Sequence, residues 1–348
     1  TAYEIYQCDW SSDVCSSDLL FGLNTLGGAI SIQTKDGLSY QGTEVEAGVG
    51  SHGRYSTEFE TGGKNDNGLN WYVNATRWAE DGWRDSSPSG ITQLFSKLGW
   101  KNRDTDVKLT YALANSNLTG NGLQQKELLD SNYKSVFTKP DQTHNNANFL
   151  NLEGKHSINE NTIFTGNAYY RKTNTHTFNG DLNEGSLGQS IYNSGETTST
   201  RYSNSYIFPD GTKCTSMIAN NGETNEKCTG LLTTTNTSQK NYGLSGQLNF
   251  FDDFSIGKNN LIFGGGYDAS RMRFTQSSQF GYLNQDRSIT AINSFADGTQ
   301  DSENTFDNRV DLSGKVVNWS AFFSDTLDRK STRLNSSHTD ISRMPSSA

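Results

Sequence analysis

The feature that most constrains the fold is a period-two alternation of apolar and polar residues over long segments. Leu69, Trp71 and Val73, for example, alternate with more polar neighbours. Successive side chains of a β-strand point to opposite faces of its sheet, so this spacing predicts strands with one apolar face and one mostly polar face. The same pattern recurs in residues 106–114, 161–172, 240–250 and 316–327.

The length of these segments favours strands that cross a membrane. They run for about 9–13 residues, whereas strands in soluble proteins average about 5–6 residues and a tilted membrane-spanning strand needs about 9–11. We predict ten strands, at residues 43–50, 54–62, 69–79, 91–100, 106–114, 146–155, 161–172, 240–250, 260–272 and 316–327.

The first connection between these strands, residues 51–53, is short, and after it the connections alternate in length. The short ones are residues 63–68, 101–105, 156–160 and 251–259, and the long ones are residues 80–90, 115–145, 173–239 and 273–315. Short turns at one rim and long loops at the other are typical of outer-membrane barrels. A β-sandwich gives no reason to collect its long loops at one end. The sequence therefore predicts an all-β fold, a partial transmembrane antiparallel β-barrel.

The composition supports a barrel and argues against other classes of protein. Hydrophobic residues make up only 32% of the chain, as expected for strands that are apolar on one face, and 11% aromatic residues argue against disorder. The net charge of −9 argues against a nucleic-acid partner, and no apolar run approaches the roughly 18 residues of a membrane helix. Aromatic residues near predicted strand ends fit interfacial girdles: Trp71, Trp78, Trp100, Tyr170, Phe250 and Trp319.

Both ends of the chain are predicted to be non-native. One short DNA, read on opposite strands, can encode both DWSSDVCSSDL (residues 9–19) and DRKSTRLNSSH (residues 328–338). This DNA resembles a sequencing-library adapter. We therefore expect residues 1–19 and 328–348 to contribute neither fold nor function.

A glycine-containing motif follows the first of these tails. Residues 20–37 read LFGLNTLGGAISIQTKDG, in which two adjacent glycines permit a tight bend before a short alternating strand. The segment resembles the end of the plug domain of TonB-dependent outer-membrane receptors. The positions that carry the resemblance are Asn24, Thr25, Leu26, Gly27, Gly28, Ile30, Thr34 and Lys35.

The resemblance continues along the chain, through EDGWRDSSPS (residues 80–89) and GNAYYRKTNTHTFNGD (residues 166–181), which look like a ferric-citrate-receptor-like subgroup. It implies that residues 20–41 form the end of a plug domain. Residues 42–327 would then be the N-terminal half of a barrel with about 22 strands, of which this fragment holds about ten.

The resemblance also implies a function and a set of partners. The expected function is uptake of a scarce ligand, an iron chelate by association with that subgroup, across the outer membrane of a Gram-negative cell. The expected partners are outer-membrane lipid, a small chelate or nutrient, and the TonB complex, which would bind through an N-terminal part absent from this chain. A passive porin and a surface-adhesin barrel are the alternatives.

Few residues can be assigned to a site from the sequence. Arg84 and Arg171 are candidates to bind an anionic chelate, because the planar guanidinium fork suits carboxylates; pairing with a carboxylate of the plug or barrel is the alternative. Cys214 and Cys228 are expected to form a disulfide in an oxidising periplasm, with a metal site or two free thiols as alternatives. No catalytic or metal-ligand spacing stands out, so we predict no enzyme, no metal and no cofactor.

Overall fold

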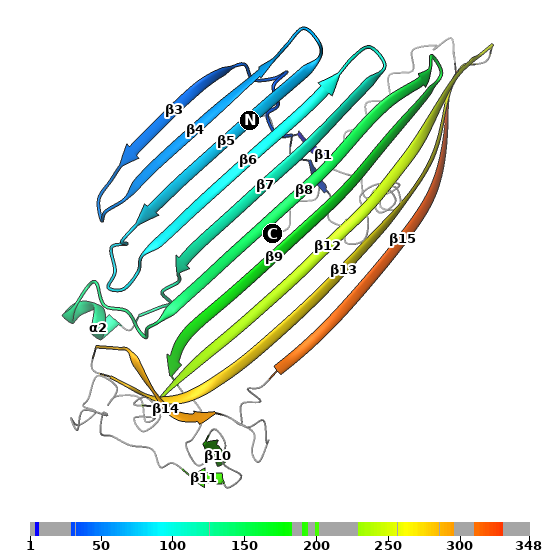
Figure 1. Ribbon diagram of the computed structural model, residues 1–348. Coiled ribbons are helices and arrows are strands. Elements are labelled where there is room, and N and C mark those ends of the chain that lie inside the picture. The colour runs from blue at the N-terminus through cyan, green and yellow to red at the C-terminus, as the bar shows by residue number, and fades with distance from the viewer. Residues whose placement is uncertain are drawn as a thin grey trace, which may run out of the picture.

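A computed structural model of the chain describes most of the predicted barrel. The described residues are 33–124, 126–182, 229–255, 257–284, 286–295 and 310–329, together with four short strands at 4–6, 29–31, 190–193 and 199–201. Apart from the strands at 4–6 and 29–31, the strands formed by these residues make one large antiparallel sheet that curves like a trough (Figure 1).

The ten predicted strands are confirmed, and each pairs with its neighbour in the chain order of the long strands. Their bounds are β3 Gly42–Val49, β4 Tyr55–Lys64, β5 Leu69–Glu80, β6 Ser89–Lys101, β7 Thr105–Thr119, β8 Asp141–Asn159, β9 Thr162–Leu182, β12 Thr229–Phe254, β13 Gly257–Leu283 and β15 Val310–Arg329. Three short strands complete the 13-stranded sheet: β10 Ser190–Asn193, β11 Ser199–Arg201 and β14 Ile289–Phe295.

The strands in the second half of the sheet are longer than predicted. β12 and β13 have 26 and 27 residues, because their ladder continues through residues 229–239 and 273–283. The apolar alternation ends before these extensions, so no amphipathic pattern marks them as strands. Threonine is abundant in the β12 extension, and its β-branched side chain suits a strand even where no face is buried.

The connections confirm the predicted asymmetry. At one end of the sheet, hereafter the short-turn end, residues 65–68, 102–104, 160–161 and 255–256 join consecutive strands. At the opposite end, hereafter the long-loop end, the connections are residues 50–54, 81–88, 120–140, 183–228 and 284–309. Helix α2 (Lys126–Ser131) and strand β14 lie at the long-loop end (Figure 1). No helix among the described residues is long and apolar enough to cross a membrane.

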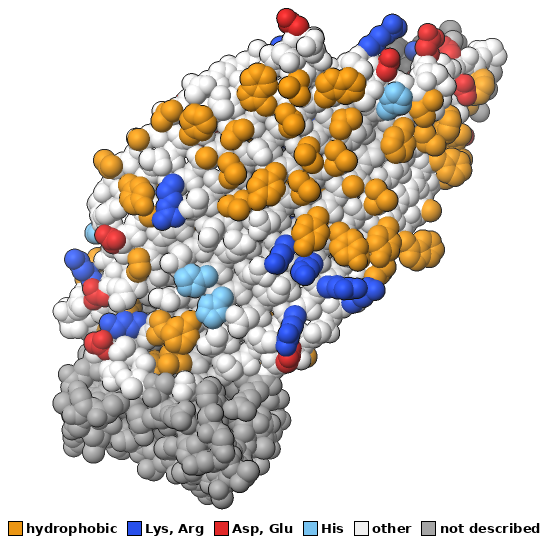
Figure 2. Space-filling view, in the orientation of Figure 1, with side chains coloured by type: hydrophobic (Ala, Val, Ile, Leu, Met, Phe, Trp, Pro, Cys, Tyr) orange, Lys and Arg blue, Asp and Glu red, His pale blue; other side chains and the backbone are white. Residues whose placement is uncertain are grey.

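The register places the predicted apolar rows on one face of the sheet, hereafter the outer face. Residues directly opposite each other on paired strands have side chains on the same face. One such row crosses eight strands without interruption: Trp71, Leu98, Leu109, Leu152, Ala168, Leu244, Tyr267 and Trp319. Large apolar side chains on this face are exposed, Leu244 to 63% and Trp319 to 81%. Figure 2 shows the band of hydrophobic side chains that results.

The opposite, inner face is mostly polar. One of the predicted girdle residues, Trp78, lies on this face, because its parity in β5 matches Tyr72 and not Trp71. That prediction was wrong for Trp78: position near a strand end does not fix the face, whereas parity does. A small buried apolar cluster, formed by Leu232, Leu283 and Ile289 with Phe137 and Phe178 packed against it, lies at the long-loop end.

The N-terminal part of the chain contributes a separate two-stranded sheet. Strand β1 (Glu4–Tyr6) pairs antiparallel with β2 (Ala29–Ser31). β1 lies within the tail that the sequence predicts to be non-native, and that prediction is not tested by the pairing. The proposed division of the chain at residues 20, 42 and 328 likewise stays a prediction.

Candidate functional site

The segment that precedes β3 is bound to the inner face of the sheet. Lys35 Nζ lies 2.9 Å from both carboxylate oxygens of Glu60 on β4. The hydroxyl of Tyr72 on β5 donates to the same carboxylate at 2.6 Å. Glu60 is buried, so its charge is compensated by one ammonium group and one hydroxyl where water has limited access.

A second contact lies two strands further along the sheet. Lys97 on β6 is 8% exposed, and its ammonium group donates to Thr34 Oγ1 at 2.6 Å and to the Thr34 carbonyl at 3.4 Å. A nearly buried lysine with only neutral acceptors is unusual, because an unpaired ammonium group loses hydration on burial. Thr34 therefore supplies the acceptors for the Lys97 ammonium group, and this contact holds the segment against β6.

A third contact joins Asp36 to β7. Its carboxylate lies 3.1 Å from Lys108 Nζ and accepts the backbone N–H of Ser39 at 2.9 Å. Burial alone would raise the pKa of the Asp36 carboxyl, but the hydrogen bonds from the Ser39 backbone and from Lys108 lower it to about 2. Asp36 is therefore a carboxylate at neutral pH and closes a tight turn over residues 36–39.

Gly37 lets the segment approach the sheet backbone. A Cβ atom at this position would lie 2.1 Å from the carbonyl oxygen of Gly63 and 2.5 Å from the backbone N and O of Trp71. No side chain fits there. Residues 34–37 thus contact the sheet through two lysine–carboxylate pairs, a lysine–threonine contact and direct backbone packing. We call this set the inner-face anchor.

Two of the motif residues from the sequence are found in the inner-face anchor, Thr34 and Lys35. Ile30 lies in β2 and pairs with Ile5 of β1. Asn24, Thr25, Leu26, Gly27 and Gly28 lie outside the described residues. The partners of the anchor on β4 to β7 were not predicted. The only sequence signal for them is a charged residue in the polar row of an alternating strand, and that signal does not tell which strand faces the segment.

Arg171 lies on the inner face, on β9. When the Asn241 side-chain amide is turned to satisfy its neighbours, its oxygen accepts from Arg171 Nε at 3.2 Å and from Nη2 at 2.6 Å. Close by, the hydroxyl of Tyr169 donates to Asp268 Oδ1 at 2.7 Å. Arg171 itself is exposed and forms no ion pair among the described residues, so its charge faces the space enclosed by the sheet.

Arg84 lies at the long-loop end, in the β5–β6 connection. Its guanidinium donates to the carbonyl of Ser135 at 3.0 and 3.3 Å, to that of Gly122 at 3.0 Å and to that of Asn121 at 3.5 Å. These bonds connect the loop at residues 81–88 with the loop at residues 120–140. The two predicted ligand-binding arginines are therefore in different places, one on the inner face and one between loops.

The long loops are also joined to each other. Lys139 pairs with Asp286 at 3.2 Å, and Arg287 donates to the carbonyl of Phe137 at 2.5 Å while its guanidinium lies 4.9 Å from the centre of the Phe137 ring. The side-chain hydroxyl of Ser288 and the ammonium group of Lys139 lower the pKa of Asp286. These contacts fix residues 135–140 against residues 284–289, above the small apolar cluster.

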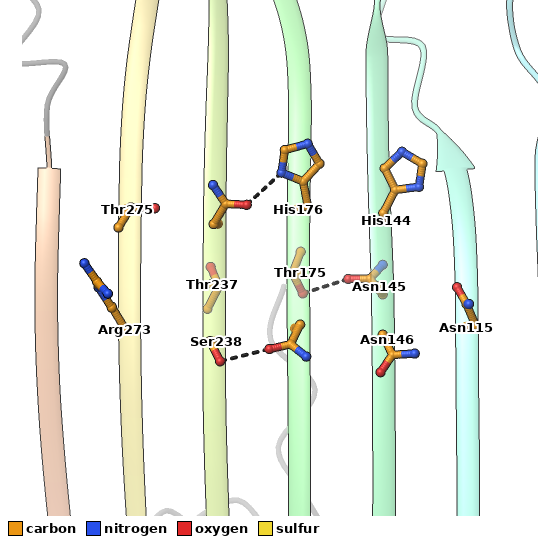
Figure 3. Close-up of a pocket in the computed structure, with 12 residues that line it drawn as sticks. Asn115, His144, Asn145, Asn146, Thr175, His176, Thr237, Ser238, Arg273 and Thr275 are labelled. Carbon is orange, nitrogen blue, oxygen red and sulfur yellow. Dashed lines mark hydrogen bonds between the residues drawn. The ribbon is translucent and has the colours of Figure 1, made fainter.

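A shallow polar hollow lies on the outer face near the long-loop end (Figure 3). There Ser238 donates to Asn174 on the neighbouring strand at 2.9 Å. Thr175 and Asn145, which are bonded to each other at 2.8 Å, have the parity of the inner face. His176 Nδ1 lies 2.8 Å from Asn236 Oδ1. Within the described ranges, no group of three His, Cys, Asp or Glu side chains could hold a metal ion. Cys214 and Cys228 lie outside those ranges.

The architecture defines a class of protein: a curved antiparallel sheet with an apolar outer face, a polar inner face and a segment bound inside it. No family model and no curated protein matches the chain. Among solved structures, the unliganded ferric citrate transporter FecA matches 82% of this chain and 34% of its own, with a TM-score of 0.51 and 11% identity. A chain of the FpvAI–pyocin S2 complex matches with a TM-score of 0.55 and 13% identity, over 90% of this chain and 41% of that one.

The similarity concerns the fold. The chain has a fold like that of part of a TonB-dependent receptor. It spans less than half the length of either matching protein. Its ten long strands and its all-β character agree with part of such a barrel.

Proposed function

We infer that the chain is the N-terminal part of a barrel that transports a scarce ligand across an outer membrane in a TonB-dependent way. The observation that carries this proposal is the inner-face anchor. A passive pore needs an open interior. It does not require a separate segment held inside the sheet by two lysine–carboxylate pairs. A plug that closes the interior has to be held in this way.

The proposed place of the sheet is the outer membrane of a Gram-negative cell. The row of apolar residues from Trp71 to Trp319 suits lipid, while the inner face offers hydroxyl, amide and charged groups to water. Backbone groups in hydrocarbon have to be hydrogen-bonded within the protein, and a sheet closed into a barrel by further strands meets that requirement. The lipid of this membrane is thus a partner of the whole outer face.

The proposed ligand is a small anionic chelate, and an iron chelate is the favoured kind. The support is Arg171, an exposed cation on the inner face whose guanidinium donates to one neutral amide, that of Asn241, and forms no ion pair among the described residues. FecA is by its name a ferric citrate transporter, which makes citrate complexes the first ligands to test. Arg84 is the weaker candidate, because its guanidinium donors are already used by three carbonyl groups.

The test is an uptake assay with the complete protein encoded by the gene from which this chain comes. Cells that make it are expected to accumulate radioactive iron supplied as a chelate, and an uncoupler of the proton gradient should abolish accumulation but not binding. Uptake that persists with the uncoupler would indicate a passive porin, and binding without any uptake would indicate an adhesin. Either result would contradict the proposal.

Within that assay, Arg171→Gln should weaken chelate binding. Arg77→Gln is the matched control, because Arg77 is an exposed arginine on the outer face. Equal affinity of both variants would remove Arg171 from the proposed site and leave the transport proposal standing.

A further inference from the structure

Four basic side chains form a single row across the outer face. Lys172 on β9 lies opposite Lys240 on β12, which lies opposite Arg271 on β13, which in turn lies opposite Lys315 on β15. Neighbouring strands are about 4.8 Å apart, so the four residues start within about 15 Å of backbone. Lys240, Arg271 and Lys315 are exposed and Lys172 is half-buried. We call these residues the basic row.

The basic row is local to one half of the sheet. The residues in the same register on the other strands are Asn148, Leu113, Leu94 and Ala75. Among the described residues no carboxylate forms an ion pair with a member of the row, and the nearby outer-face carboxylate of Asp311 pairs with Arg273 instead. Like charges directly opposite each other destabilise a sheet, so the row needs a counter-charge from outside the described part of the chain.

The position of the row indicates what supplies that charge. It lies four residues, or about 13 Å, toward the long-loop end from the apolar row that ends in Trp319. Tyr170 and Tyr242 lie between the two rows, where amphipathic rings of an interfacial girdle are expected. Beyond the basic row the outer face is polar, around the hollow of Figure 3. Figure 2 shows the change from hydrophobic side chains to a run of Lys and Arg.

We propose that the basic row binds the phosphate group of a lipid in the leaflet on the long-loop side, with the acyl chains of that lipid against the apolar band. The inference rests on the proposed membrane position but not on the transport activity. A soluble anion would contact only the basic row and would leave the apolar side chains beside it uncovered. A membrane lipid covers both halves, since its phosphate lies at the level where apolar surface ends. Lysine and arginine near an anionic leaflet are each attracted to it over about a Debye length.

The experiment measures the reactivity of single lysines in vesicles. The complete protein encoded by the gene from which this chain comes is refolded into phosphatidylcholine vesicles with or without phosphatidic acid. It is then acetylated briefly with a water-soluble reagent and analysed by peptide mass spectrometry. Lys172, Lys240 and Lys315 should react at least about fivefold more slowly with phosphatidic acid present, an effect that salt should reduce. Lys101 at the short-turn end and Lys126 in α2 are internal controls and should change by less than about twofold.

Two variants make the result specific to the row. K172Q/K240Q/R271Q/K315Q should lose roughly 100-fold in affinity for phosphatidic acid dispersed in detergent, and R77Q/K101Q/K126Q/K134Q, which loses the same charge elsewhere, should lose far less. K172R/K240R/R271K/K315R keeps the charge and should bind as the original does, which excludes a folding defect as the cause.

Three results would overturn the proposal. Equal protection of row and control lysines in inserted protein would show a general charge effect and no site. Equal protection by inorganic phosphate with phosphatidylcholine alone would show a site for a free anion and not for a lipid. Failure of the complete protein to insert at all would contradict the membrane position, and with it both the row as a lipid site and the barrel proposal.

Discussion

The contact between Lys35 and Glu60 offers the sharpest test of the inner-face anchor, through the substitution Glu60→Gln. The change keeps the shape and one acceptor but removes the charge. The Lys35 side chain is 53% exposed, so its ion pair is discounted to about 0.5–1 kcal/mol. The buried hydrogen bond from Tyr72 weakens by about 1 kcal/mol when its acceptor becomes neutral. The two losses together should reduce the docking free energy of the segment by about 1.5–2 kcal/mol. The equilibrium constant for opening of the segment should then rise roughly 10- to 30-fold.

Hydrogen exchange measured on the peptide that covers residues 33–41 reports this opening. Glu60→Gln should speed exchange there by roughly 10- to 30-fold and leave β8 and β9 unchanged. Glu44→Gln is the matched control, because Glu44 lies directly opposite Glu60 on β3 but is exposed. Equal acceleration in both variants, or none in Glu60→Gln, would refute the assignment of Glu60 as an anchor.

Three further predictions concern the anchor and the loops. The Asp36 carboxylate has its pKa lowered to about 2 in the fold, so its contribution is complete above its unfolded pKa near 3.9 and is lost as the pH falls toward 2. Relative to the intrinsic exchange rate, exchange at residues 33–41 should therefore accelerate more below about pH 4 in the original chain than in Asp36→Asn. Gly37→Ala should displace the segment at a cost of about 1–3 kcal/mol, seen as cleavage near residue 37 by added protease, whereas Gly122→Ala, where a Cβ meets no atom within 4 Å, should behave as the original. Arg84→Met should free the loop at residues 120–140 and increase its proteolysis, while Arg103→Met, at an exposed short turn, should not.

The sequence predicted the parts of the fold that depend on an amphipathic repeat. The segment from Leu69 alternates strongly enough to define β5, its faces and its length. The extension of β12 through residues 229–239 was missed, because residues 233–239 are polar on both faces and the two adjacent leucines before them set no hydrophobic period. Trp78 was assigned to the wrong face for a related reason: its strand was predicted correctly, but its proximity to the strand end outweighed its parity.

The site was less predictable than the fold, because its residues come together only through register. Thr34 and Lys35 stood out in a motif, whereas Glu60 and Lys97 became anchor residues only once the pairing of β4, β5 and β6 was known. The basic row is the clearest case. Its members are separated by up to 143 positions in the sequence, from 172 to 315, and no local pattern links them until Lys172 is placed opposite Lys240.

The central claim is that one face of this sheet meets lipid and the other meets water. The most direct measurement is a spin-label scan of residues 106–114 of β7 in the complete protein inserted into phosphatidylcholine vesicles, with collisions by oxygen and by a water-soluble nickel chelate recorded at each position. Labels at Val107, Leu109, Tyr111 and Leu113 should collide mostly with oxygen, whereas those at Lys108, Thr110 and Ala112, which face the interior, should collide far less with oxygen, in a strict period of two. A scan without that period, or with both rows shielded from both reagents, would contradict the account.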